Sequence, residues 1–304
     1  MSNLAPIALF VYNRPEHTRQ TIESLKANHL AKESDFFIFA DGAKSEKDEQ
    51  AVKQVADYIA TVTGFKSVTI VKQEKNLGLA NSIIGGVTYL SEKYGKFMVF
   101  EDDLICSEHT LTYLNEALER YQNEDKILHI CASMHPLKLS ADMPETFLYR
   151  APHSCGWASW KRAWDKFNPD IDDLISQFDE QKIKDFTFDG KMNFWKQMND
   201  FKNGKNNSWA IRWYASVFLN NGLALNVTRS LINNIGHDGS GVHSNVENIY
   251  DVEIYPNRIQ YFPTEIVENK RMYEVVKSFY ANRKGSLFAR GIRFLRQKLA
   301  KFVF

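Results

Sequence analysis

Apolar segments alternate with helical patterns over the first 130 residues, and this alternation constrains the fold more than any other feature of the sequence. Apolar-rich runs at 7–12, 36–40, 67–73 and 96–104 are typical of strands buried in a parallel sheet. Between them, apolar residues recur at helical spacing, and Pro15 suits a first helical turn. Strands that alternate with helices predict an α/β fold with a doubly wound, mostly parallel sheet.

The periodicity breaks up after about residue 130, and aromatic residues become dense. All six tryptophans lie between 157 and 213. We therefore predict an N-terminal α/β half over 1–130, a second, aromatic-rich half over 131–265 and a separate tail over 266–304. Most of these aromatic residues are expected in the core, but the ring of Trp157 in the segment CGWASW could also stack on a sugar.

The tail combines apolar residues at four-then-three spacing with basic residues at the other positions, which predicts a basic amphipathic helix. Residues 275–304 hold eight Lys and Arg and no acid, leaving 30 basic and 37 acidic residues in the other 274. Such a helix either packs on the body or binds an anionic membrane surface, and the absence of acids favours the membrane. The acidic body argues against a nucleic-acid partner.

Composition places the chain among ordinary globular proteins. Hydrophobic residues make up 44% of the 304 residues and charged residues 25%, which excludes a disordered, collagen-like or coiled-coil chain. The three cysteines form no C-x-x-C pair, so neither a zinc knuckle nor a disulfide framework is indicated. With no run of 18 apolar residues and no recognisable signal peptide, we expect a cytoplasmic protein that could lie on the inner face of the membrane.

Polar residues follow all four predicted strands. They are Asn13-Arg14, Asp41-Gly42, Asn76-Leu77-Gly78 and Glu101-Asp102-Asp103. Because the carboxyl ends of parallel strands meet at one edge of the sheet, these four sets should share one ligand-binding rim.

The triplet Glu101-Asp102-Asp103 is the sharpest of these signals. Three adjacent carboxylates repel one another unless a cation compensates, and Mg²⁺ or Mn²⁺ bound to carboxylates and a diphosphate would do so. If the strand continues through them, Glu101 and Asp103 share a face and Asp102 points away. A solvated acidic loop or a helix cap is the alternative.

The remaining candidates are weaker alone. Asp41 could accept hydrogen bonds from a nucleotide or be an ordinary turn residue, and Arg14 could approach the nucleotide or begin a surface helix. Asn76 and Gly78 open a helix whose N-terminus suits phosphate.

Two histidines flank a glycine-rich segment, NNIGHDGSGVHS, at residues 233–244. His237 or His243 could contact the diphosphate or complete the metal shell, and the glycines would let a loop close over a ligand. A plain surface loop is the alternative.

The segments FVYNRP, FADG, NLGLANS and FEDD, in that order, resemble family 2 glycosyltransferases of GT-A fold. The Glu-Asp-Asp form, CGWASW and GHDGSGVHS look more like N-acetylglucosaminyltransferase I. Together these resemblances cover about residues 5–245. They imply a nucleotide-sugar donor, with a UDP-sugar favoured, a Mn²⁺ or Mg²⁺ ion, and inversion at the anomeric carbon.

The resemblance also assigns roles to residues. It implies that Asp103 binds the metal, that Glu101 and Asp102 lie near the donor sugar and ribose, that Asp41 contacts uridine, and that His237 or His243 lies in a loop over the donor. The second half would then bind the acceptor, a glycan or a lipid-linked acceptor, as in polysaccharide biosynthesis.

One departure concerns the catalytic base. The related transferase has its base in a Trp-Asp-Asp-Trp stretch, and the matching segment here, SWAIRW at 208–213, has no carboxylate. An acceptor hydroxyl still needs deprotonation, and Asp189, Asp238 and Asp179 are the substitutes. The expected function is therefore a metal-dependent inverting hexosyl- or N-acetylhexosaminyltransferase. A nucleotidyltransferase and an inactive sugar- or nucleotide-binding protein stay open as alternatives.

Overall fold

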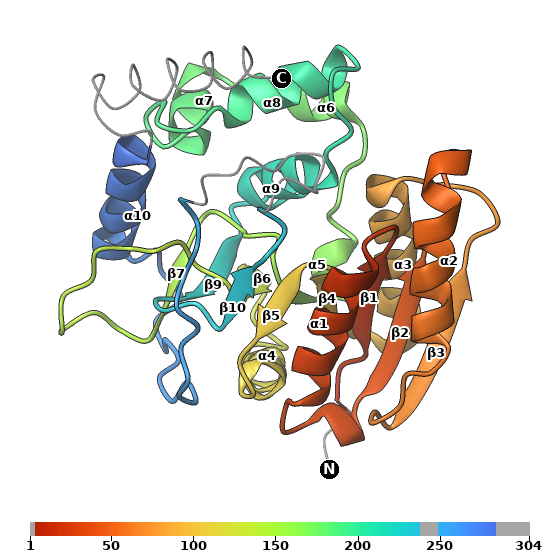
Figure 1. Ribbon diagram of the computed structural model, residues 1–304. Coiled ribbons are helices and arrows are strands. Elements are labelled where there is room, and N and C mark those ends of the chain that lie inside the picture. Colours follow the sequence, from red (N-terminus) through yellow and green to blue (C-terminus); the bar gives the residue numbers. More distant parts are fainter. Residues whose placement is uncertain (1–3, 238–248, 284–304) are drawn as a thin grey trace, which may run out of the picture.

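The computed structural model describes residues 4–237 and 249–283 and shows a mixed α/β molecule built on one large sheet (Figure 1). Its strand order is β3-β2-β1-β4-β8-β6-β9-β7. Two further strands form a small separate sheet, β10-β5. The functional question is which residues this order brings to one edge.

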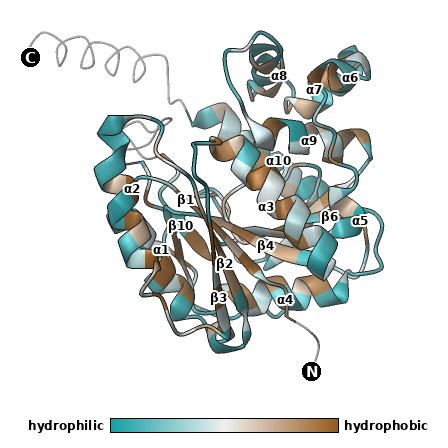
Figure 2. Cartoon of the chain, turned by 90° about the vertical axis from the view of Figure 1, so that its right-hand side faces the viewer, coloured by the Kyte–Doolittle hydropathy of each residue, from teal (hydrophilic) through white to brown (hydrophobic). Residues whose placement is uncertain are grey.

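The first four strands are β1 (Ile7–Val11), β2 (Asp35–Ala40), β3 (Ser67–Lys72) and β4 (Lys96–Glu101). They pair in parallel, with β1 between β2 and β4, so the predicted parallel sheet is confirmed for this half. The apolar runs of β1, β2 and β4 are buried almost throughout. Figure 2 shows them as hydrophobic ribbons inside a more hydrophilic shell.

Helices cover both faces of this half, as right-handed crossovers require. The helices α1 (Pro15–Lys26) and α2 (Glu46–Ile59) pack against each other, whereas α3 (Leu79–Tyr94) packs on β1 and β4 (Figure 1). A short 3₁₀ turn, η1 (Ala31–Glu33), follows α1. Pro15 begins α1, as its position in the sequence predicts.

The second half continues the same sheet with mixed directions. Its strands are β6 (Ile127–Cys131), β7 (Thr146–Tyr149), β8 (Trp157–Trp160) and β9 (Leu223–Val227). β8 runs antiparallel between β4 and β6, β6 and β9 are parallel, and β7 is antiparallel to β9. One sheet therefore runs from the first half into the second.

The helices after β8 carry many of the aromatic residues. They are α5 (Lys161–Trp164), α6 (Ile171–Ser176), α7 (Glu180–Phe186), α8 (Phe194–Lys202), α9 (Trp209–Leu219) and α10 (Lys270–Asn282). Trp157, Trp164, Trp209 and Trp213 form a buried cluster of ring contacts. The predicted amphipathic segment at 285–304 lies outside the described residues.

The small sheet joins α1 to the rest of the molecule. β5 (Leu104–Cys106) pairs antiparallel with β10 (Ile232–Asn234) and leads into α4 (Thr110–Arg120). On its other side, the backbone amides of Leu104 and Cys106 donate to the hydroxyls of Thr21 and Ser24 on α1. In the part of the chain that the structure describes, no helix is both long and apolar enough to cross a bilayer.

Candidate active site

A tight turn of two aspartates ends β4. The strand stops at Glu101, and Asp102 and Asp103 form the turn that leads into β5. This corrects the expectation that the strand continues through all three acids and points Asp102 away from the other two. Because a turn replaces the alternation of a strand, Asp102 and Asp103 both reach the same cation.

That cation is the guanidinium of Arg14, which stands at the end of β1 and immediately before α1. Its Nη2 donates to Oδ1 of Asp102 and, at 2.9 Å, to Oδ2 of Asp103. Burial alone would lower the pKa of Arg14, but the two carboxylates outweigh it and raise that pKa above its ordinary value. Arg14 is therefore fully charged and neutralises part of the acidic turn.

Glu101 has no such partner. Its carboxyl group makes no hydrogen bond and no ion pair within residues 4–237 and 249–283. Burial, together with the neighbouring charges of Asp103 and Asp102, raises the pKa of Glu101 to about 8. A carboxyl group in this state would be stabilised in its ionised form by an added cation.

The strand β10 and the residues after it close the other side of the turn. Asn234 Nδ2 lies 3.3 Å from Oδ1 of Asp103, and the amide of Ile235 donates to the Asp103 carbonyl at 2.8 Å. A Cβ atom on Gly236 would lie only 2.1 Å from Oδ2 of Asp103. The sequence analysis missed Asn234 and Gly236. The signal was the first glycine of the NNIGHDGSG segment, which is needed for this close backbone approach.

These residues fit a hard divalent cation. Glu101, Asp102 and Asp103 supply only oxygen donors, which Mg²⁺ and Mn²⁺ prefer. The side chain of Asp103 keeps 13% of its surface exposed, so it is not fully closed off from solvent at the rim. The carboxyl group of Glu101, which has no hydrogen bond or ion pair among the described residues, is the observation that favours a cation here.

Asp41 follows β2 on the same rim, but all of its acceptor positions are used by the protein. Oδ1 accepts from the amides of Gly42 and Leu77, and Oδ2 accepts from the amide of Gly78 and from Asn76 Nδ2, at 2.8–3.0 Å. A carboxylate offers about four lone-pair positions. The expected contact of Asp41 with a nucleotide therefore does not fit this geometry. Asp41 instead shapes the turn before α3.

The same bonds change the expectation for Asn76 and Gly78. The Asn76 amide group also donates to the Gly42 carbonyl, so this side chain holds the turn together. Gly78 has a φ of 76° and caps α3, and its N–H points to Asp41. Asn13 likewise donates to Asp48 on α2, at 2.9 Å.

A pocket of about 220 Å³ lies between β2, β3 and α3, with Asp41 in its wall. Its lining is mostly apolar, and Leu77 and Tyr89 are partly exposed beside it. The other lining residues include Phe39, Val71, Gln73, Asn81 and Gly86. A flat, partly apolar group such as a nucleobase suits a lining of this kind.

Trp157 does not lie in this site. Its side chain is fully buried and stacks against Trp209, with ring centroids 5.4 Å apart. The expectation that Trp157 contacts the donor sugar is therefore wrong, because no face of the ring is free. Gly156 before it has a φ of 63° and packs against Ile232, which places the CGW segment under β10.

His237 is described, and its ring lies 5.9 Å from that of Tyr250, which in turn lies 5.2 Å from the ring of His135. Burial lowers the pKa of His135 well below its ordinary value, so this imidazole is neutral near pH 7. Sequence reasoning did not single out His135. Asp238 and His243 lie outside the described residues.

Asp189 is a poor candidate for the base. Its carboxylate pairs with Lys277 of α10 at 3.0 Å, and this contact lowers its pKa. A general base whose pKa is lowered in this way gains little proton affinity from its surroundings. Asp179, the third substitute, caps α7 by accepting from the Lys182 amide.

Comparison with known proteins adds an independent observation. Residues 7–131 match the family model described as glycosyl transferase family 2. No curated protein gives a significant match.

Several solved structures share part of the architecture. A mannosyltransferase, PcManGT from Pyrobaculum calidifontis, crystallised with GDP-Man and Mn²⁺, is 10% identical, with 71% of this chain and 69% of that chain covered at a TM-score of 0.39. GalNAc-T7 with UDP, GalNAc and Mn²⁺ is 9% identical, covering 75% and 43%, at 0.44. A UDP-glucose pyrophosphorylase with UDP-glucose is 12% identical, covering 74% and 90%, at 0.36. Likenesses this distant carry no argument about activity.

The family match covers about two fifths of the chain. That segment contains Arg14, the Asp102–Asp103 turn and the first four strands. The resemblance to family 2 glycosyltransferases is thereby confirmed over residues 7–131.

Proposed function

We propose that the protein is a metal-dependent, inverting glycosyltransferase that takes a hexosyl or N-acetylhexosaminyl group from a nucleotide-sugar, in the first instance a UDP-sugar. The observation that carries the proposal is the turn of Asp102 and Asp103 at the carboxyl end of β4, paired with Arg14 at the end of the neighbouring strand. This edge, inside the matched family segment, is where open α/β sheets bind ligands.

The diphosphate of the donor would lie against Asp103. Asp103 and Glu101 would hold Mn²⁺ or Mg²⁺, which when bound supplies positive charge to the departing diphosphate. Arg14 adds a second positive charge at the same place. The pocket beside Asp41 would bind the nucleobase of the donor. This pocket and the acidic turn lie at the ends of β2 and β4, which flank β1 and are two strand spacings apart, about 10 Å.

The reaction proposed is a single displacement. A base takes the proton of the acceptor hydroxyl, the acceptor oxygen bonds to the anomeric carbon, and the bond from that carbon to the diphosphate oxygen breaks, with inversion. We assign the base to Asp238, which follows Gly236 by two residues in the sequence; the backbone at Gly236 approaches Asp103 too closely to accept a Cβ. In this proposal residues 131–265 bind the acceptor, which is a glycan or a lipid-linked acceptor, and residues 1–130 bind the donor. The tail, 266–304, attaches the protein to an anionic membrane.

The first test uses the acidic turn. Asp103→Asn should abolish transfer and reduce Mn²⁺-dependent binding of UDP, measured by calorimetry, at least tenfold. Asp57→Asn, an exposed change on α2, is the matched control and should leave both unchanged. Unchanged Mn²⁺-dependent binding in Asp103→Asn would remove the metal assignment.

The second test separates the two candidate bases. Asp238→Asn should lower turnover by 10²-fold or more with little change in donor binding, whereas Asp189→Asn should lose no more than a few-fold. The reverse result would move the base to Asp189. Donor binding without donor hydrolysis or transfer in the unaltered protein would identify a binding protein, and release of pyrophosphate from a nucleoside triphosphate would identify a nucleotidyltransferase.

A further inference from the structure

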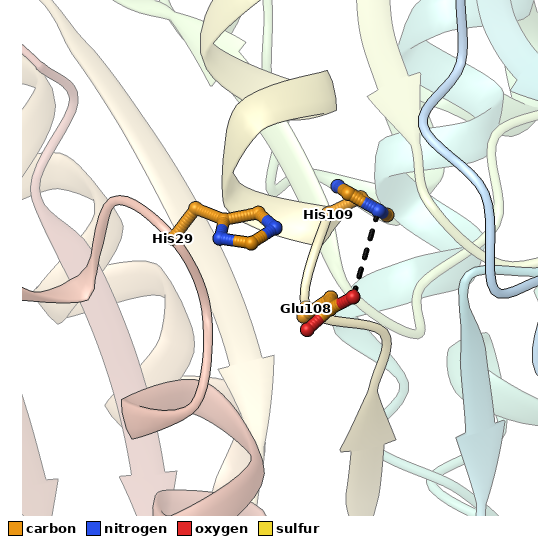
Figure 3. Close-up of side chains that lie close together, drawn as sticks. All are labelled: His29, Glu108 and His109. Atoms are coloured by element: carbon orange, nitrogen blue, oxygen red, sulfur yellow. Dashed lines mark ion pairs between the residues drawn. The ribbon is translucent and has the colours of Figure 1, made fainter.

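Two histidines and a glutamate gather away from the proposed donor site. His29 lies in the loop after α1, and Glu108 and His109 lie between β5 and α4 (Figure 3). One ligand atom from each residue lies within 4.8 Å of the other two. The backbone joins the two segments, because the His29 amide donates to the Glu108 carbonyl at 3.1 Å.

The contacts in this cluster are unlike those of a closed hydrogen-bond network. Nε2 of His109 lies 3.7 Å from Oε1 of Glu108, which is too long for a hydrogen bond. The rings of His29 and His109 lie 4.8 Å apart and are tilted by 47°. Nδ1 of His109 is shielded from water and has no hydrogen-bond partner among the described residues. Within the described residues, this nitrogen of His109 therefore has no partner, and no direct hydrogen bond joins His109 to Glu108.

The separation between His109 and Glu108 is close to that between two ligands of a tetrahedral ion, and all three ligand atoms lie within 4.8 Å of one another. Zinc bonds of 2.0–2.1 Å place two ligands roughly 3.3–3.4 Å apart. The 3.7 Å between His109 and Glu108 needs only a small closure. His29 and Glu108 are exposed, so their side chains can rotate to make it, while the backbone between them is already fixed.

We propose that His29, Glu108 and His109 form a zinc site that links the loop after α1 to the turn before α4. Two imidazoles and one carboxylate are a donor set typical of zinc, with a fourth position left for water. The acidic turn at the donor site offers only oxygen and suits Mg²⁺ or Mn²⁺. The chain would therefore hold two cation sites of different chemistry.

The place of this cluster suggests a structural role. Arg14 and His29 stand at opposite ends of α1, and Asp103 and Glu108 stand at opposite ends of β5. The twelve residues of α1 span roughly 18 Å, so the cluster is remote from the acidic turn. An ion here would link the end of α1 to the end of β5. The ion pair of Arg14 with Asp103 links the same two elements at their opposite ends. The proposal does not depend on the proposed function.

The test is a titration of the full-length protein, purified and treated with chelator, with ZnCl₂ alone. We expect one zinc ion bound with a dissociation constant in the micromolar range or tighter, and a rise in melting temperature that saturates with it. Substituting Co²⁺ should give visible absorption bands of a four-coordinate site. His29→Gln and His109→Gln should each weaken binding at least tenfold, and Glu108→Gln should weaken it to a smaller extent.

Matched controls separate this site from others. His17→Gln changes another histidine of the α1 region, and Asp103→Asn disables the acidic turn. Both should bind zinc as the unaltered protein does. Equal loss in Asp103→Asn, retained binding in both His29→Gln and His109→Gln, or binding only at millimolar zinc would each overturn the proposal. Circular dichroism at 25 °C checks that the variants are folded.

Discussion

Arg14 and Asp103 are 89 residues apart in the sequence and are joined by an ion pair of 2.9 Å between Nη2 and Oδ2. Arg14 immediately precedes α1, and Asp103 immediately precedes β5. Side-chain hydroxyls of α1 hold the backbone of β5, so helix and strand are fixed to one another. The ion pair therefore joins the residues immediately before two elements whose relative position is set along their length.

Removing Arg14 should destabilise the protein. Arg14→Ala leaves Asp102 buried beside Asp103 without a cation, and breaking a buried pair from one side costs about 3 kcal/mol in free energy of unfolding. Urea unfolding with EDTA present measures it. Arg19→Ala removes an exposed pair with Glu16, which solvent screens, and should cost much less stability than Arg14→Ala. Equal losses in the two variants would contradict the prediction, and Mn²⁺ should restore part of the loss in Arg14→Ala.

Gly236→Ala should disrupt the donor site from the backbone side. The added Cβ would lie 2.1 Å from Oδ2 of Asp103 and 3.0 Å from Nη1 of Arg14, so the chain or the ion pair must move. We expect at least a tenfold loss of Mn²⁺-dependent UDP binding. Gly85→Ala on α3, where a Cβ meets open space, should raise stability by about 1 kcal/mol; because Gly85 also lines the pocket beside Asp41, this variant is a control for stability and not for UDP binding. Unchanged UDP binding in Gly236→Ala would contradict the prediction.

Asp41→Asn distinguishes a structural role from a donor contact. An amide nitrogen in place of one oxygen would face N–H donors, either Gly42 and Leu77 or Gly78 and Asn76, and leaving these without an acceptor costs about 2 kcal/mol. Urea unfolding should show this loss without any donor present. Normal stability together with lost UDP binding would instead show that Asp41 contacts the nucleotide directly.

His129 predicts acid sensitivity. The imidazole is buried, its Nδ1 accepts from Trp213 Nε1 at 2.9 Å, and its Nε2 donates to the His153 carbonyl. Burial lowers the pKa of His129 to about 3. The unfolded chain therefore binds one more proton below about pH 6.5, and stability falls as the pH falls from 6.5 towards 3, by up to about 1.4 kcal/mol per pH unit.

Urea unfolding between pH 7 and pH 5 measures this slope. His129→Asn cannot titrate and should show a shallower dependence of unfolding free energy on pH, even if it is less stable throughout. The same slope in both proteins would show that other groups carry the acid sensitivity. Burial also lowers the pKa of His153, to about 4, so part of the slope should remain.

The strands and the rim were predictable because their signals are local. Continuous apolar runs identify β1, β2 and β4, and the polar residues after them follow from parallel order. The carboxylate triplet could be assigned to the edge of the sheet for the same reason. The turn that the triplet forms could not be predicted, because the apolar Leu104 after it makes the strand seem to continue past Asp103.

The roles of single residues depended on partners that are distant in sequence. Nothing near Asp41 indicates that the amides of Leu77 and Gly78 would fill its oxygens. The burial of Trp157 follows from its contact with Trp209 on α9. His29 and His109 meet only because α1 and β5 lie side by side. No spacing in the sequence therefore predicts their cluster.

The hydroxyl groups of α1 that bind the backbone of β5 also determine whether a further strand can pair with β5. A strand with one free side ordinarily offers its outward amides to a further strand, from the same chain or from another molecule. In β5 the amides of Leu104 and Cys106 are already taken by Thr21 and Ser24. The helix α1 thus takes the place that a third strand would occupy beside β5. On this side of β5, the small sheet cannot pair with a further strand.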